Sequence, residues 1–112
     1  MTAVETRLWL LQRATALVMA PLVLGHLALI VYAVQGGLSA EEILSRTRGN
    51  VFWAAFYGVF VLAAAVHGSI GLRSVLREAA RLSTKSAGLL AAAFAAALVL
   101  LGLRAVYAVI FA

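Results

Sequence analysis

The chain has 112 residues, of which 65% are hydrophobic and only 12% are charged, with a mean hydropathy of +1.07. Soluble domains carry about 25% charged residues, so this composition indicates a membrane protein. Despite the net charge of +5, no soluble domain remains that could present a basic face to nucleic acid. The absence of cysteine excludes disulfides, iron–sulfur clusters and covalently attached c-type haem on this chain.

The first predicted element is a membrane-spanning helix. Its apolar core is the run at residues 14–34, which is interrupted only by Pro21 and His26 and reaches the length of about 20 residues that spanning requires. The core of a signal peptide has only about 7–15 apolar residues and is followed by a small-residue cleavage site. The run is longer and no such site stands out in a polar context, so we expect this helix to be retained.

Two further spanning helices follow a polar, glycine-containing loop, in which a helical turn can begin at Ser39. The second apolar run, Val51–Leu72, contains His67, and its helix is expected to continue for a turn or more beyond this run. The third run begins near Ala87. We therefore expect one domain over residues 1–112, an all-α integral membrane protein with three transmembrane helices. The predicted helix bounds are about 8–35, 50–79 and 86–111.

Basic residues at the ends of the apolar runs predict the orientation of the chain. Six of the nine lie on one side of the three helices, whereas Arg46, Arg48 and Arg104 lie on the other. Because membrane proteins carry excess Lys and Arg on the cytoplasmic side, we expect a cytoplasmic N-terminus. The six residues are Arg7, Arg13, Arg73, Arg77, Arg81 and Lys85.

His67 is an ionisable residue inside an apolar run, which makes it the first candidate for a functional site. At helical spacing it shares a stripe with Phe60, Ala63, Ala64, Gly71 and Ser74, and all of these except Phe60 are small. Small residues let a second helix approach closely, and they also leave room for a flat macrocycle. The spacing alone leaves open whether these residues serve helix packing or make room for a macrocycle. If they serve helix packing, the imidazole would bond a serine or a backbone carbonyl on the neighbouring helix.

His26 is the second candidate, and its depth separates it from His67. It lies 13 residues beyond Arg13, roughly 20 Å along a helix, whereas His67 lies six residues before Arg73, roughly 9 Å from the same edge. Two ligands of one iron must share a depth, so we expect the two histidines to serve different partners. A ligand role and a packed core position both remain open for His26.

Two segments carry a resemblance to a known family. The first is WLLQRATALVMAPL at Trp9–Leu22, with the core R-A-T-A, and the second is HGSIGLRSVLRE at His67–Glu78, with the pattern H-x-x-x-G-x-x-x-x-x-x-[DE]. Together they resemble the small membrane-anchor subunits of succinate dehydrogenase (complex II). The resemblance covers about residues 9–81, while the third helix agrees only generically.

The resemblance implies a non-catalytic anchor with a role in electron transfer. In such complexes a flavoprotein subunit and an iron–sulfur subunit on the cytoplasmic face oxidise succinate, and two three-helix anchors hold them to the membrane. The chain would then form half of a heterodimeric anchor bundle in the lipid of a bacterial inner membrane. Its partners would be the second membrane-anchor subunit and the two dehydrogenase subunits.

The resemblance also implies a set of site residues. His67 matches an axial ligand of a b-type haem, and Arg13 matches an arginine near the quinone pocket and the haem propionates; Arg73 could serve likewise. One haem b is expected, and two remain open, because in two-haem relatives the first helix also carries a histidine ligand, here His26. Quinone would be the substrate at a site shared with the partner subunits.

Two departures from the family pattern bear on this expectation. Ala79 follows Glu78 where many of these anchors have a tyrosine that contacts the quinone, so the chain's share of the quinone site is open. Trp9 stands where the other anchor type has a serine, which indicates the smaller of the two anchors.

The sequence leaves two alternative functions: a haem-free structural or assembly subunit, and the anchor of a fumarate reductase running in reverse. A small proton-coupled transporter is disfavoured because it needs a carboxylate inside the membrane. All four acidic residues lie outside the apolar runs: Glu5, Glu41, Glu42 and Glu78.

Overall fold

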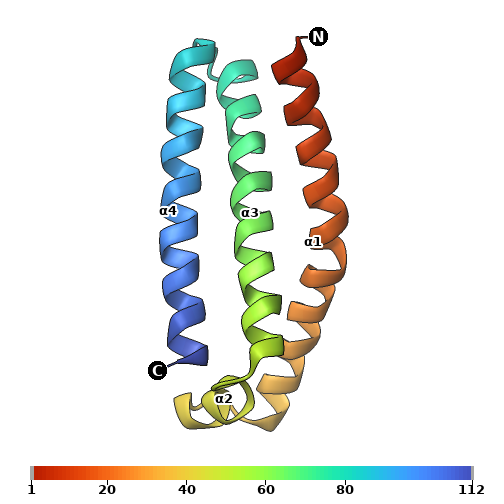
Figure 1. The fold of residues 1–112 in the computed structure, drawn as a ribbon, viewed down its shortest axis with the longest axis vertical. Helices are drawn as coiled ribbons and strands as arrows, with labels where there is room; N and C mark the ends of the chain where they lie inside the picture. The colour runs from red at the N-terminus through yellow and green to blue at the C-terminus, as the bar shows by residue number, and fades with distance from the viewer. Residues whose placement is uncertain (1, 112) are drawn as a thin grey trace.

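The computed structural model describes residues 2–111, and over these residues the chain folds into four α-helices without a β-strand (Figure 1). Three helices are long, and the short helix α2 lies in the connection between the first two of them. In chain order they are α1 (Ala3–Gly36), α2 (Ala40–Thr47), α3 (Val51–Glu78) and α4 (Thr84–Ile110).

The long helices lie side by side in an elongated bundle with α3 between α1 and α4, and α3 packs against both (Figure 1). The bundle measures 48 × 23 × 23 Å. The start of α1 and the turn between α3 and α4 lie at one end, and α2 lies at the other with the end of α4. Residues near the start of α1 therefore face residues near the end of α3.

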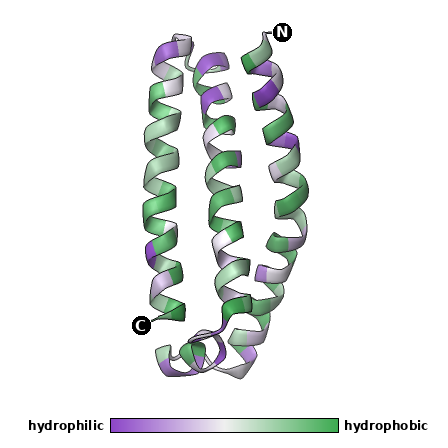
Figure 2. Cartoon of the chain, in the orientation of Figure 1, coloured by the Kyte–Doolittle hydropathy of each residue, from purple (hydrophilic) through white to green (hydrophobic). Residues whose placement is uncertain are grey.

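The three long helices are long and apolar enough to cross a membrane, with mean hydropathies of 2.3, 1.8 and 2.3 over their most apolar windows (Figure 2). In each of these segments at most 11% of the residues are buried within the chain. Most apolar side chains therefore face outward, where lipid or other membrane helices would cover them. The structure confirms the predicted class of an all-α membrane protein with three spans.

Side-chain caps fix where the helices begin. Thr2 and Glu5 form a reciprocal capping box that starts α1 at Ala3, five residues earlier than the apolar pattern predicts. Ser39 and Glu42 form a second box, so the helical turn expected at Ser39 becomes the two turns of α2. Hydropathy alone marks the membrane-embedded part of a helix and not its capped end.

Small residues bring α3 and α4 together. All but one of the buried residues of the two helices are small: Ala63, Ala65 and Ser69 on α3 and Ala87 and Ala91 on α4, with Ile110 as the exception. At Gly102 of α4 the approach is so close that a Cβ would overlap the side chain of Val61. Such close contact is the usual way in which membrane helices gain packing energy without a hydrophobic driving force.

The short helix α2 closes the far end of the bundle. The Thr47 hydroxyl donates to the Val109 carbonyl at 2.7 Å, and the Gly49 N–H donates to the Ile110 carbonyl at 2.7 Å. These bonds satisfy carbonyl groups that the last turn of α4 leaves without helical partners. The Arg46 guanidinium donates to the Gly37 carbonyl at 2.8 Å and so ties α2 to the end of α1.

Candidate functional site

His67 is half-buried on the side of α3 that meets α1, and one of its ring nitrogens is held by α1. Nδ1 lies 3.3 Å from the backbone oxygen of Gln12 and 3.2 Å from the hydroxyl of Thr15. The carbonyl can only accept, and the Thr15 hydroxyl already donates to the Leu11 carbonyl at 2.7 Å. The proton is therefore assigned to Nδ1, which donates to both oxygens and leaves the lone pair on Nε2.

This tautomer is the one that a metal-binding imidazole requires. Histidine ligands almost always donate their second ring N–H to a carbonyl, a carboxylate or water, which orients the ring and strengthens the other nitrogen as a donor. In His67 the Gln12 carbonyl and the Thr15 hydroxyl fill this role. The sequence left open whether the imidazole bonds a neighbouring helix or faces a macrocycle. The structure is compatible with both, because Nδ1 bonds α1 while Nε2 has no partner among the described residues.

The two glycines near His67 face side chains of the neighbouring helices. A Cβ at Gly71 would lie 3.6 Å from the Gln12 side chain of α1, and one at Gly68 would lie 3.6 Å from Phe94 of α4. These are ordinary van der Waals distances, so an alanine would fit at either position and the packing of the helices does not require these glycines. Both interpretations, helix packing and room for a macrocycle, therefore stay open for Gly71.

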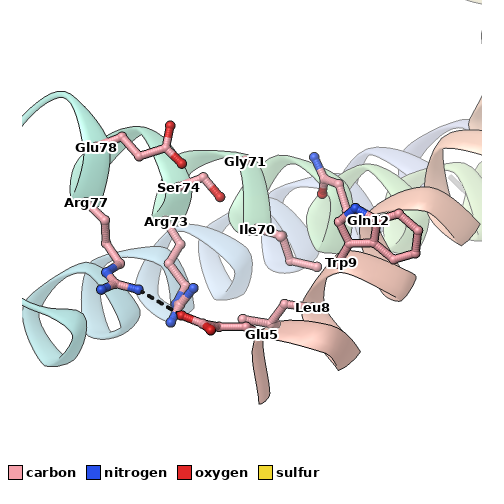
Figure 3. A pocket seen from close by; sticks show the side chains of 10 residues that line it. All are labelled: Glu5, Leu8, Trp9, Gln12, Ile70, Gly71, Arg73, Ser74, Arg77 and Glu78. Atoms are coloured by element: carbon pink, nitrogen blue, oxygen red, sulfur yellow. Dashed lines mark ion pairs between the residues drawn. The ribbon is translucent and has the colours of Figure 1, made fainter. Parts of the chain in front are cut away.

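A cleft of about 540 Å³ opens between the first turns of α1 and the last turns of α3, and Gln12, whose backbone oxygen bonds His67, lines it (Figure 3). Its mouth carries charged groups, among which Arg77 and Glu5 form an ion pair at 3.6 Å across the two helices. Apolar and aromatic side chains line it further along α1 and α3. The lining residues are Glu5, Leu8, Trp9, Gln12, Ile70, Gly71, Arg73, Ser74, Arg77 and Glu78.

The two arginines singled out from the sequence occupy different positions. Arg73 lines the cleft. Arg13 does not; it is exposed, and its guanidinium lies over the Trp9 ring, 4.8 Å from the ring centroid. Trp9 in turn lines the cleft, so Arg13 borders the cleft only through this aromatic side chain.

His26 lies in a separate, apolar environment near the other end of the bundle. Its ring packs edge-on against Phe60 at 5.3 Å and Tyr57 at 6.2 Å between ring centroids, and it lines a second cleft of about 380 Å³. These α3 residues precede His67 by seven and ten positions, roughly 10–15 Å along the helix. The two histidines thus differ in depth, as the sequence predicts.

His26 also lacks the arrangement that orients His67. Within residues 2–111 no hydrogen bond joins either of its ring nitrogens to another residue. No group of three or more His, Cys, Asp or Glu side chains converges in this part of the chain. Of the two histidines, His67 is therefore the one whose ring already has the second-nitrogen hydrogen bond that is usual for a histidine ligand.

Residues 2–103 match the family of the succinate dehydrogenase/fumarate reductase transmembrane subunit. The chain belongs to this family. No curated protein and no solved structure matches the chain. The match confirms the resemblance carried by the two sequence segments, and it identifies the chain as a multi-pass membrane subunit of a larger complex.

Two residues beside the site of this transmembrane subunit were not singled out from the sequence. Gln12 and Thr15 hold His67, and the Gln12 side chain also lines the cleft. A signal exists in retrospect, since Glu5 and Gln12 lie seven residues apart, about two helical turns, and so place polar side chains on one face of the helix from its start into the apolar run. Which residue of α3 this stripe meets depends on the packing of the two helices.

Proposed function

We propose that this transmembrane subunit is the smaller of two membrane anchors in a succinate:quinone oxidoreductase and that it binds one b-type haem. His67 would hold the iron through Nε2, and the second axial ligand would come from the partner anchor. The observation that carries this proposal is the bonding of His67, with Nδ1 donating to the Gln12 carbonyl and the Thr15 hydroxyl. An anchor without haem would have no need of an imidazole whose second nitrogen is kept free.

The bound haem would supply a one-electron carrier between the dehydrogenase subunits and the membrane. The contribution of this chain is to fix the His67 tautomer and to exclude water from one side of the imidazole through the contact between α1 and α3. Coordination would also remove the cost of an unpaired ring nitrogen in lipid. The proposal assigns no second haem to His26, because its ring has aromatic neighbours and no hydrogen-bonding partner among the described residues.

The cleft between α1 and α3 is the proposed contribution of this chain to the quinone site. Leu8, Trp9 and Ile70 offer apolar contact to a flat ring, and Gln12, Arg73 and Ser74 offer polar groups to its oxygens. Reduction of a quinone to a quinol takes up two electrons and two protons, so the pocket must bind a ring that bears oxygens in both states. Side chains of the partner subunits would complete the pocket.

The proposed setting is a bacterial inner membrane, with the cleft on the cytoplasmic side. The basic residues Arg73, Arg77, Arg81 and Lys85 cluster at the cleft end of the bundle, which supports this orientation. The flavoprotein and iron–sulfur subunits would dock at this end and oxidise succinate there. The same architecture would serve fumarate reduction if the quinol were the electron donor.

The proposal is tested by the absorption spectrum of the complex that contains this chain. We expect b-type bands in the reduced-minus-oxidised spectrum, their loss in His67→Ala and their retention in His26→Ala. Succinate oxidation with a soluble artificial acceptor serves as the control for assembly. Absence of the bands from the unaltered complex, or an unchanged spectrum in His67→Ala, would contradict the proposal.

A further inference from the structure

The hydroxyl of Ser74 on α3 differs from the other serine and threonine hydroxyls of the helices. Beyond the first turn of a helix, such a hydroxyl can bond the backbone carbonyl three or four residues earlier. This bond forms at every comparable position of the described chain except Ser74, whose hydroxyl has no hydrogen-bonding partner within residues 2–111. The positions with the bond are Thr15, Ser45, Thr47 and Ser69.

The free hydroxyl is accessible from the cleft between α1 and α3. Ser74 lines this cleft, and its side chain ends one bond beyond Cβ, so the hydroxyl lies at or near the wall (Figure 3). Among the partly buried residues of the described chain, the one side-chain polar atom that lacks a partner and is also enclosed belongs to Gln12. The Ser74 hydroxyl lacks a partner and is therefore open to a ligand.

The other polar side chains of the cleft each act in only one direction. Guanidinium and indole groups can only donate a hydrogen bond, and ionised carboxylates can only accept one. In Gln12 the amide oxygen is enclosed, which leaves at most the donating nitrogen. Among the residues that line the cleft, Ser74 thus has the one accessible group that both donates and accepts. The charged and indole side chains in this comparison are Glu5, Trp9, Arg73, Arg77 and Glu78.

The proposed reaction calls for such a group. The oxygen of a quinone is a carbonyl that can only accept a hydrogen bond. After the ring takes up two electrons, which succinate supplies in the proposed function, and two protons from water, the same oxygen is a hydroxyl that can donate. A serine hydroxyl can donate to the first form and accept from the second by rotating about its Cβ–Oγ bond, so the ring does not have to move.

We propose that Ser74 hydrogen-bonds one ring oxygen of the ligand in both redox states and so holds the ring in the cleft throughout its reduction. This inference rests on the proposed quinone site and adds to it the residue that retains the ring. Ser74 lies seven residues beyond His67, two turns or roughly 10 Å along the same face of α3. The oxygen that it holds would therefore lie on the cleft side of the proposed haem ligand.

The test measures binding at equilibrium rather than turnover. A radiolabelled short-tailed quinone is titrated into the oxidised complex, and its quinol is titrated into the complex reduced with succinate. In Ser74→Ala both dissociation constants should rise by about fivefold, the effect of losing one neutral hydrogen bond. A shift in only one of the two constants, or in neither, would overturn the inference.

Ser69→Ala is the matched control, with the same substitution on the same helix. Ser69 is buried, its hydroxyl bonds the Val66 carbonyl at 3.1 Å, and it does not line the cleft. Both constants should stay within about twofold of their original values, and a shift as large as that of Ser74→Ala would overturn the inference. An unaltered complex that binds neither ligand would instead refute the proposed quinone site. The haem spectrum and succinate oxidation with an artificial acceptor, recorded on the same samples, report separately on the proposed function.

Discussion

At the scale of single residues, the bonding of His67 gives the most specific information about its role. An ionisable ring inside a membrane helix is costly unless each of its polar atoms has a partner. Nδ1 has two partners on α1, the Gln12 carbonyl and the Thr15 hydroxyl. Nε2 then depends on a group from outside this chain, and in the proposed function that group is the haem iron.

Thr15→Val should retain the haem and raise its midpoint potential. Without the hydroxyl, Nδ1–H keeps only the Gln12 carbonyl, the imidazole becomes a weaker donor, and the ferric state loses stabilisation. A lost hydrogen bond of about 1 kcal/mol sets an upper limit of about 40 mV for this shift. A redox titration of the complex measures it.

Thr6→Val is the matched control for this experiment, since the Thr6 hydroxyl bonds only the Thr2 carbonyl within α1, at 3.0 Å. Its potential should equal that of the unaltered complex. A lower potential in Thr15→Val, or the same shift in both variants, would show that the hydroxyl does not act through His67.

Arg13→Leu should impair the quinone reaction and spare the dehydrogenase. The guanidinium lies over Trp9, which lines the cleft, so its loss removes both a charge and the support of an aromatic wall. We expect a fall of about fivefold in quinone reductase rate, corresponding to the loss of a cation–π contact of about 1 kcal/mol. Succinate oxidation with a soluble acceptor should stay near its normal rate, and an equal fall in both assays would indicate a defect in assembly.

The position of His67 could be predicted from the sequence, but its surroundings could not. An ionisable residue in an apolar run is visible in the sequence, and its match to the family pattern gives a role. That α1 supplies the Gln12 carbonyl and the Thr15 hydroxyl depends on the register of two packed helices. The absence of Arg13 from the cleft depends on the same register, because it follows from which face of α1 meets α3.

At the scale of helices, the closest packing joins α3 to α4 rather than to α1. Gly102 and the buried alanines let the two helices approach until no space remains for another methyl group. The contact between α1 and α3 instead leaves the cleft open at one end. The α3–α4 pair thus forms the rigid part of the bundle, and α1 forms one wall of the candidate site.

Gly102→Ala should destabilise the subunit, because the added Cβ would overlap the Val61 side chain. Overpacking of this kind costs about 1–3 kcal/mol, and we expect a lower unfolding temperature of the complex in detergent. Adding Val61→Ala should restore most of the loss, since it removes the overlapping methyl groups. A single variant as stable as the unaltered complex would contradict the close approach.

The three spanning helices could be predicted from hydropathy, but their ends could not. Hydropathy predicts that the first helix begins near residue 8. It begins instead at Ala3, because the Thr2–Glu5 capping box extends it beyond the apolar run. The third was expected near residue 86 and begins at Thr84, where Ser83 caps it by accepting from the Ser86 N–H. Capping acts on polar residues that a hydropathy pattern leaves out.

At the scale of the whole molecule, the bundle buries little of its own apolar surface. At most 11% of any spanning window is buried within the chain, and large side chains such as Leu17 and Leu100 are more than two-thirds exposed. Three helices with α3 in the middle therefore present broad apolar faces. This suits a membrane subunit of a larger complex, in which lipid and other subunits cover the remaining surface.

The proposed orientation predicts which loops a membrane-impermeant maleimide can reach. The chain has no cysteine, so single variants are clean probes. Glu41→Cys on α2 should react in intact spheroplasts, and Ala79→Cys at the end of α3 should react only after permeabilisation, because the proposed orientation places the basic end in the cytoplasm. Labelling in the reverse pattern would invert the proposed topology.

The most direct test of the central claim is the haem-to-flavin ratio of the intact complex and of two histidine variants. If His67 alone supplies this chain's iron ligand, the ratio is about one in the unaltered complex and in His26→Ala, and it falls towards zero in His67→Ala. A ratio of about two that drops to one in His26→Ala would contradict the account, as would a ratio near zero in the unaltered complex.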